Sequence, residues 1–183
     1  MSMTTIIGIA GLAGAGKDTA AEALLRHCGY TRMALADPIK IIAATYFGVD
    51  VHAPKTPEVR GLYQRLGTEV GRAYDPDCWV KFLEHRIGLL PPSLRGVVIP
   101  DVRFRNEAEW VLRKKGLMIY IEDRGGLEGL AGEHASEIGI RAYNGLPMQF
   151  IHNDRTIEDL HVAVLELWSS WVVTSLLRST DIV

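Results

Sequence analysis

The sequence has little cysteine and no excess of positive charge, and both absences exclude classes of protein. Its only two cysteines, Cys28 and Cys78, form no CxxC pair, so we expect neither a zinc finger nor a disulfide framework. A formal net charge of −2, from 20 basic and 22 acidic residues, provides no global field for binding nucleic acid polymers. We therefore expect a reduced, cytoplasmic chain without a nucleic acid partner.

The sequence also lacks the usual marks of export and membrane insertion. No apolar run reaches the roughly 20 residues that are needed to span a bilayer. The N-terminal stretch before Lys17 has no basic leader, and glycines interrupt its apolar part, which is unlike a signal peptide. We expect neither a transported protein nor a membrane partner.

The sequence does contain a regular alternation of short apolar runs and longer amphipathic segments over residues 1–183, which indicates a single α/β domain. The continuous apolar run from Gly96 to Pro100 predicts a central strand, buried on both faces of a parallel sheet. Gly116 is expected to cap the end of one helix and Thr156 the start of another. The predicted strands are 4–10, 30–36, 96–100, 117–122 and 149–152, and the predicted helices are 17–28, 38–46, 58–73, 79–87, 105–115 and 157–169.

A glycine-rich loop that joins a predicted strand to a predicted helix is the strongest functional signal. Residues 11–17 read GLAGAGK, which fits the GxxxxGK pattern of a phosphate-binding loop in the required context. Glycines allow successive backbone N–H groups to surround phosphate oxygens, and the helix N-terminus adds partial positive charge. The less specific interpretation is a strand-to-helix turn with an incidental lysine. The residues predicted to bind ATP here are Gly11, Ala13, Gly14, Ala15, Gly16, Lys17, Asp18 and Thr19.

The residue after the lysine departs from the usual loop. Ser or Thr normally binds magnesium at this position, whereas this chain has Asp18 followed by Thr19. We expect magnesium to be held mainly by phosphates and water, with Asp18 and Asp101 as candidate ligands. The GKxT variant favours a kinase over a switch-type GTPase.

An acid followed by arginines marks the end of the predicted central strand. Asp101 precedes Arg103 and Arg105, at the sheet edge where ligands collect in open α/β folds. Asp101 would hold magnesium through water, and Arg103 would grip the phosphate of an acceptor. The alternative is an Asp that only caps the next helix, beside solvated arginines.

Six blocks in one order resemble the deoxynucleoside monophosphate kinases of bacteriophage type, within the nucleoside monophosphate kinases. The blocks are GLAGAGKDTAA (11–21), LADPIK (35–40), RLGTEVGR with DPDCWVKF (65–82), VIPDVRFRNEAEW (98–110), GEHASEIGI (132–140) and FIHNDRTIEDL (150–160). The resemblance implies transfer of the ATP γ-phosphoryl group to a deoxynucleoside monophosphate. It also implies a P-loop kinase fold, in which helices flank a five-stranded parallel sheet, with an acceptor-binding insert at 37–95 and a lid at 123–146.

The resemblance also implies roles for individual residues. Asn153 would lie beside the adenine, and Arg124 and Arg141 of the glycine-rich lid would reach the transferring phosphoryl group. His134 matches its family block, although a lone histidine more often serves packing or a loop hydrogen bond. The implied acceptor residues are Asp37, Lys40, Arg65, Asp101, Arg103 and Glu137.

Two other functions remain open at this stage. One is a hydroxyl-directed or other small-metabolite P-loop kinase, of the dephospho-coenzyme A or phosphomevalonate type. A hydroxyl acceptor would need a carboxylate base, for which Asp37 is the candidate. A regulatory P-loop NTPase would bind ATP without transferring its phosphate, but the arginine pairs and the missing NKxD motif oppose it.

The C-terminal segment has more apolar residues than one helical face can accommodate. They are Leu165, Leu167, Trp168, Trp171, Val172, Val173, Leu176 and Leu177. Either this segment wraps its own core, or Trp168 and Trp171 form part of a two-fold interface in a homodimer.

Overall fold

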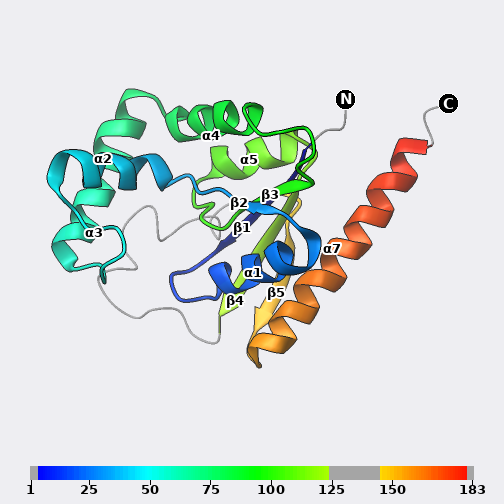
Figure 1. Ribbon diagram of the computed structural model, residues 1–183. Coiled ribbons are helices and arrows are strands. Elements are labelled where there is room, and N and C mark those ends of the chain that lie inside the picture. The colour runs from blue at the N-terminus through cyan, green and yellow to red at the C-terminus, as the bar shows by residue number, and fades with distance from the viewer. Residues whose placement is uncertain (1–3, 124–144, 181–183) are drawn as a thin grey trace. The chain divides into compact units, whose positions relative to one another are not determined.

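The computed structural model describes residues 4–123 and 145–180, and in these ranges the chain forms a parallel sheet with flanking helices (Figure 1). The strands are β1 (Thr5–Gly11), β2 (Thr31–Arg32), β3 (Gly96–Ile99), β4 (Leu117–Asp123) and β5 (Gln149–Asn153). The helices are α1 (Lys17–Cys28), α2 (Asp37–Phe47), α3 (Pro57–Gln64), the π-helix η1 (Arg65–Arg72), α4 (Cys78–Gly88), α5 (Arg105–Arg113) and α7 (Ile157–Thr180).

The sheet has the order β2-β3-β1-β4-β5, and every pairing in it is parallel. The predicted five-stranded parallel sheet is therefore confirmed. All four residues of β3 are buried, as its unbroken apolar run predicted, although β1 rather than β3 takes the middle position. Because the strands are parallel, their carboxyl ends all lie along one edge of the sheet.

The core lies on both faces of this sheet. On one face, Ile7 and Ile9 of β1 and alternate residues of β4 pack against α1 and α7. On the other face, Gly8 is closely surrounded by Val102, Val111 of α5 and Met118 of β4. The alternation follows from the two-residue period of a strand, which sends successive side chains to opposite faces.

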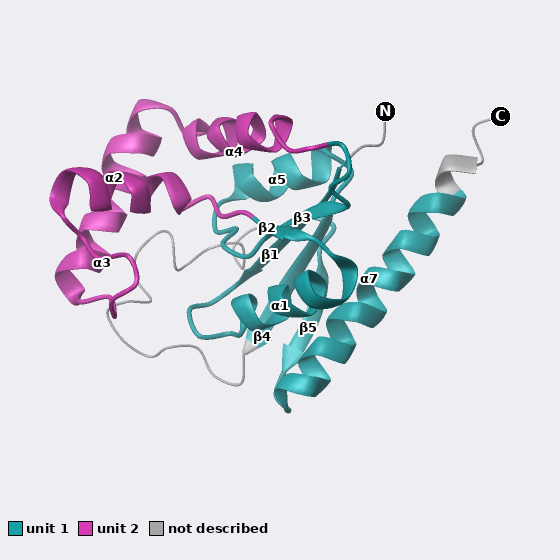
Figure 2. Cartoon of the chain, viewed as in Figure 1, with its two compact units in different colours: residues 1–32, 92–183 teal, residues 33–91 magenta. Residues whose placement is uncertain are grey.

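The chain divides into two compact units (Figure 2). The first contains residues 1–32 and 92–183 and includes the sheet with α1, α5 and α7. The second, residues 33–91, contains α2, α3, η1 and α4, and covers most of the predicted acceptor-binding insert.

Several element boundaries differ from the predictions. The second strand covers only Thr31–Arg32, and the predicted helix 58–73 is an α-helix followed by a π-helix. The residue with a left-handed conformation after α5 is Lys115, at a φ of 57°, and not Gly116. Gly116 is needed for a different reason, because a Cβ atom there would lie 2.5 Å from the carbonyl oxygen of Ile6.

The last helix is longer than predicted and continues to Thr180. Thr156 does cap its start, since the Thr156 hydroxyl accepts the N–H of Asp159 while the Asp159 carboxylate accepts from Thr156. By length and composition, the stretch Ile157–Leu177 would be long and apolar enough to cross a membrane, contrary to the prediction. Its first half nevertheless belongs to the core of the sheet-containing unit, because Leu160 and Val164 are buried there.

Candidate functional site

The glycine-rich loop occupies the predicted place between the carboxyl end of β1 and the start of α1. Gly14 and Gly16 have φ values of 82° and 94°, which L-residues with side chains rarely adopt. Gly16 is the N-cap of α1, and its carbonyl accepts the N–H of Ala20. The loop therefore leads directly into a helix N-terminus, which is the arrangement that binds phosphate oxygens.

Lys17 and Asn153 both contact the backbone of this loop. The Lys17 ammonium group donates to the carbonyl oxygens of Gly11 and Leu12, at 2.8 and 2.5 Å. Asn153, the last residue of β5, donates its side-chain amide to the Ala15 carbonyl at 2.9 Å. A Cβ atom on Gly16 would lie 2.6 Å from the same amide nitrogen, so the glycine permits this close approach.

Asp18 extends from the first turn of α1, and 83% of its side chain is exposed. Its carboxylate forms an ion pair of 3.5 Å with Arg32 at the end of β2. No sequence pattern indicates Arg32, since its position depends on a strand of only two residues. The pair places one acidic and one basic group beside the phosphate-binding loop.

Asp101 and Arg103 lie in the turn between β3 and α5, beside the strand that leads into the loop. The register pairs Ile99, the last residue of β3, with Gly8 of β1. Beyond the end of β3, the Val102 amide donates to the Ile9 carbonyl at 3.2 Å. The structure thus brings this turn, the glycine-rich loop and Asn153 to the same edge of one sheet.

Glu107 is a component of this turn that the sequence analysis missed. One of its carboxylate oxygens accepts the backbone N–H groups of Arg103 and Phe104, at 2.8 and 3.0 Å. Glu107 is 2% exposed and is the one buried charged residue in the described part of the chain. The third residue of the helix is the usual place for such a cap, but Phe104 offers no side-chain oxygen, so the familiar S/T-x-x-E signature is absent.

Two of the predicted acceptor residues are neighbours in the second unit. Asp37 begins α2 and accepts the N–H of Ala34 at 3.0 Å, and its other oxygen lies 3.9 Å from the Lys40 ammonium group. Arg65 is the first residue of η1 and is exposed. The unit therefore presents Lys40 and Arg65, two of the three cationic residues of the predicted set, and the carboxylate of Asp37 is fixed by a backbone bond.

The π-helix η1 is held by contacts within the same unit. Trp79 of α4 donates its indole N–H to the Gly67 carbonyl at 2.9 Å, and Arg72 donates to the same oxygen at 2.9 Å. A Cβ atom on Gly71 would lie 2.2 Å from the Trp79 ring, so the indole can lie against the helix only because residue 71 is glycine.

The lid predicted for 123–146 lies almost entirely outside the described residues. The described residues also leave out the two predicted lid arginines, Arg124 and Arg141, together with the predicted acceptor residue Glu137 and with His134. Among the described residues, no group of three or more His, Cys, Asp or Glu side chains forms a ready-made metal site. Oxygen ligands for magnesium would therefore come from single carboxylates, together with phosphates and water.

A phosphate-binding loop at the carboxyl edge of a five-stranded parallel sheet is the arrangement of a P-loop fold. Solved kinases share this fold: a gluconokinase from Sinorhizobium meliloti 1021 superposes with a TM-score of 0.55 at 14% identity, covering 98% of this chain and 99% of its own. Shikimate kinase from Aquifex aeolicus gives a TM-score of 0.52 at 13% identity, with coverages of 94% and 99%. At such identities these structures establish the fold.

The sequence comparisons define the family. Residues 51–164, more than half of the chain, match the family model of deoxynucleotide monophosphate kinases. A putative deoxynucleotide monophosphate kinase of Acanthamoeba polyphaga mimivirus is 28% identical over 184 aligned positions, which cover 87% of this chain and 94% of the viral protein. The chain belongs to the deoxynucleotide monophosphate kinase family, and it is an ATP-dependent kinase.

Proposed function

We propose that the protein transfers the γ-phosphoryl group of ATP to the phosphate of a deoxynucleoside monophosphate, giving a deoxynucleoside diphosphate and ADP. The observation that carries this function is the family match over residues 51–164. The glycine-rich loop at 11–17 lies outside the matched residues and adds independent support, because it supplies a site for the phosphates of ATP.

The ATP phosphates bind at the loop between β1 and α1. Backbone N–H groups of the loop and the α1 N-terminus receive the phosphate oxygens, with Thr19 in the first turn. Lys17 turns from the carbonyls of Gly11 and Leu12, which it now contacts, toward the terminal phosphates. Its charge then stabilises the negative charge of the transferring group.

The acceptor binds on the other side of the transferred group. Arg103 holds the acceptor phosphate as a bidentate donor, and Asp101 in the same turn would hold magnesium through water. Asp37, Lys40, Arg65 and Glu137 contribute the remaining acceptor contacts. Arg124 and Arg141 reach the transferring group when the segment 123–146 closes as a lid and excludes water.

Magnesium fits this arrangement, because exposed Asp18 and half-buried Asp101 both offer carboxylate oxygens at the ATP edge of the sheet. When bound, the ion neutralises charge between the phosphates that are separated in the reaction. Arg32, paired with Asp18, keeps that carboxylate from adding an uncompensated negative charge beside ATP.

The reaction needs no general base. The second pKa of a phosphate monoester is about 6, so the attacking oxygen is already largely deprotonated at neutral pH. Catalysis then consists of alignment and charge neutralisation by Lys17 and the arginines. Asp37, the candidate base for a hydroxyl acceptor, is therefore not required to accept a proton. One of its oxygens already accepts the N–H of Ala34.

We further propose that the enzyme works in the cytoplasm, that of a host cell if the gene is from a phage, because ATP and nucleoside monophosphates are available there. We also propose that it forms a homodimer through the end of α7. Val173, Leu176 and Leu177 form a terminal apolar face of this helix, and they are 57%, 64% and 62% exposed.

A substrate screen tests the function directly. ADP release is measured with ATP, magnesium and each of the four common deoxynucleoside monophosphates, the ribonucleoside monophosphates, dephospho-coenzyme A and phosphomevalonate. We expect turnover with at least one deoxynucleoside monophosphate and none with the last two. Activity confined to either of those would reject the proposal, as would ATP hydrolysis that no acceptor stimulates.

A further inference from the structure

Glu107 is a buried charged group for which the proposed chemistry has no direct use. The residue is 2% exposed and lies in the first turn of α5. Removing a carboxylate from water is costly unless hydrogen bonds replace the lost hydration. The bonds that it makes therefore indicate what its burial accomplishes.

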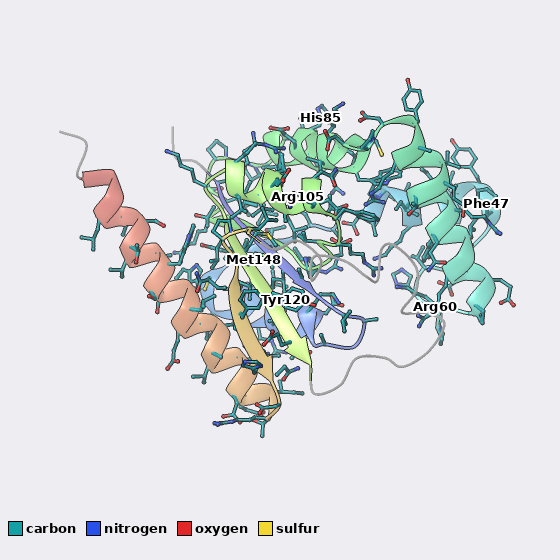
Figure 3. All side chains as sticks on the ribbon, turned by 180° about the vertical axis from the view of Figure 1, so that it is seen from behind. Phe47, Arg60, His85, Arg105, Tyr120 and Met148 are labelled. Atoms are coloured by element: carbon teal, nitrogen blue, oxygen red, sulfur yellow. The ribbon has the colours of Figure 1, made fainter. Side chains whose placement is uncertain are left out.

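Helix capping accounts for only one of the two backbone bonds. A glutamate at the third position of a helix accepts the N–H of the N-cap residue, which here is Phe104. The same oxygen also accepts the N–H of Arg103, which precedes the helix and is not one of its amides. Glu107 thus reaches beyond the helix that it caps and into the turn that carries Asp101 and Arg103. Figure 3 labels Arg105, which marks the start of α5 beside this turn.

The turn is consequently fixed through three consecutive amides. The Val102 amide is bonded to Ile9 of β1, two residues before Gly11 begins the phosphate-binding loop, and the next two amides are bonded to Glu107. Hydrogen bonds to a buried, charged acceptor are stronger than bonds between neutral groups. The Arg103 side chain therefore starts from a backbone whose position relative to the loop is fixed.

We propose that Glu107 is a positioning residue for phosphoryl transfer, which sets the distance between the Arg103 guanidinium group and the phosphate-binding loop. The inference rests on the proposed function, in which Arg103 holds the acceptor phosphate. Glu107 does not touch either nucleotide. Its effect is to keep Arg103 aligned, and misalignment by about 1 Å can lower turnover about 100-fold.

Kinetics of substituted enzymes test the proposal. Glu107→Ala should raise the KM for the deoxynucleoside monophosphate or lower kcat by at least about tenfold, with the KM for ATP changed less than about threefold. Glu107→Gln should restore most of the activity, because its amide oxygen can still accept both N–H groups. The matched control is Glu109→Ala on the same helix, which removes the exposed ion pair with Arg105 and should leave both KM values unchanged.

Amide hydrogen exchange provides a readout that does not depend on activity. The N–H groups of Arg103 and Phe104 should exchange at least about tenfold faster in Glu107→Ala, and at nearly the original rate in Glu107→Gln. If the Ala variant does not fold, Glu107→Asp replaces it, since its shorter side chain cannot reach both amides.

Three results would overturn the inference: an Ala variant that raises both KM values equally or changes neither kcat nor KM, a Gln variant as impaired as the Ala variant, or unchanged exchange at both amides. A parent enzyme that phosphorylates no deoxynucleoside monophosphate would instead reject the proposed function. In that case the exchange rates alone would decide whether Glu107 fixes the turn.

Discussion

Lys17 is the residue whose removal tests the phosphate-binding loop most directly. Its ammonium group contacts the carbonyl oxygens of Gly11 and Leu12 in the loop, so Lys17→Ala should leave the fold intact. We expect turnover to fall by at least about 100-fold, because the variant lacks a charge directed at the transferring phosphoryl group. Steady-state kinetics and a thermal melt measure the two effects. Near-parent activity in the folded variant would contradict the role of the loop.

Asn153 is a second single residue whose replacement tests the phosphate-binding loop. The resemblance implied a place beside the adenine, whereas its amide is bonded to the Ala15 carbonyl of the loop. If it holds the loop, Asn153→Ala should raise the KM for ATP about tenfold and impair ATP and GTP alike. His152→Ala is the matched control, since His152 neighbours it on β5 but pairs with Glu122. A variant that loses only its preference for ATP over GTP would point to adenine contact instead.

The sequence predicted individual residues well where one local pattern determines the conformation. Lys17 and its glycines depend on a seven-residue motif between a strand and a helix, and the structure places them there. The role of Glu107 was not predicted, for two reasons. Phe104 stands where the capping signature has Ser or Thr, and the bond to the Arg103 amide depends on the conformation of a turn. Arg32 and Asp18 form their ion pair in the fold, where β2 pairs with β3 and lies against α1, and no local pattern indicates it.

At the scale of helices and strands, the main departures from the predictions are the π-helix η1 and the length of α7. The π-helix η1 could not be foreseen, because its geometry depends on a tryptophan from the next helix and on Gly67 and Gly71, which sequence periodicity treats as ordinary helix positions. The last helix continues past the predicted end at residue 169, since no glycine or proline follows to stop it. Its β-branched residues lower helix propensity only slightly.

The capping of α7 gives a prediction with a defined pH dependence. Hydrogen bonds from Thr156 hold the pKa of the Asp159 carboxyl below its usual range. A carboxyl whose pKa is lowered by folding contributes stability above its unfolded pKa, and that contribution is lost as the pH falls through the lower folded value. Thr156→Ala should therefore melt about 3 °C below the parent at neutral pH.

The difference between the two melting temperatures should narrow in acid, below the unfolded pKa of about 3.9. Thermal melts of both proteins across this range measure it. The control variant Thr156→Ser keeps the hydroxyl and should melt like the parent. A constant difference at all pH values would show that the Asp159 carboxylate takes no part in the cap.

At the scale of the whole molecule, the chain combines a nucleotide-binding sheet with a second unit inserted between β2 and β3. The residues predicted for the acceptor are divided between the two: Asp101 and Arg103 belong to the unit with the sheet, and Asp37, Lys40 and Arg65 to the other.

The exposed end of α7 leads to a prediction about assembly. Trp168 donates to the Tyr30 hydroxyl at 3.0 Å and, like Trp171, packs against the core, so both tryptophans are already partly used within the chain. Val173, Leu176 and Leu177 remain exposed and lie three and four residues apart, which places them on one face. Light scattering at micromolar concentration should give about 41 kDa, twice the chain mass, if this face pairs with its copy.

Charge on this face should prevent the pairing. The double variant Leu176→Lys with Leu177→Lys should scatter as a particle of 20.3 kDa and remain folded, because both side chains are exposed and lysine suits a helix C-terminus. Val162→Lys, at an exposed position in the first half of the same helix, should remain dimeric. A parent protein that scatters at 20.3 kDa would exclude the dimer. Loss of the dimer in Val162→Lys as well would show that the interface includes the first half of α7. There the helix packs against α1, and His161 contacts the Thr19 carbonyl just after the phosphate-binding loop.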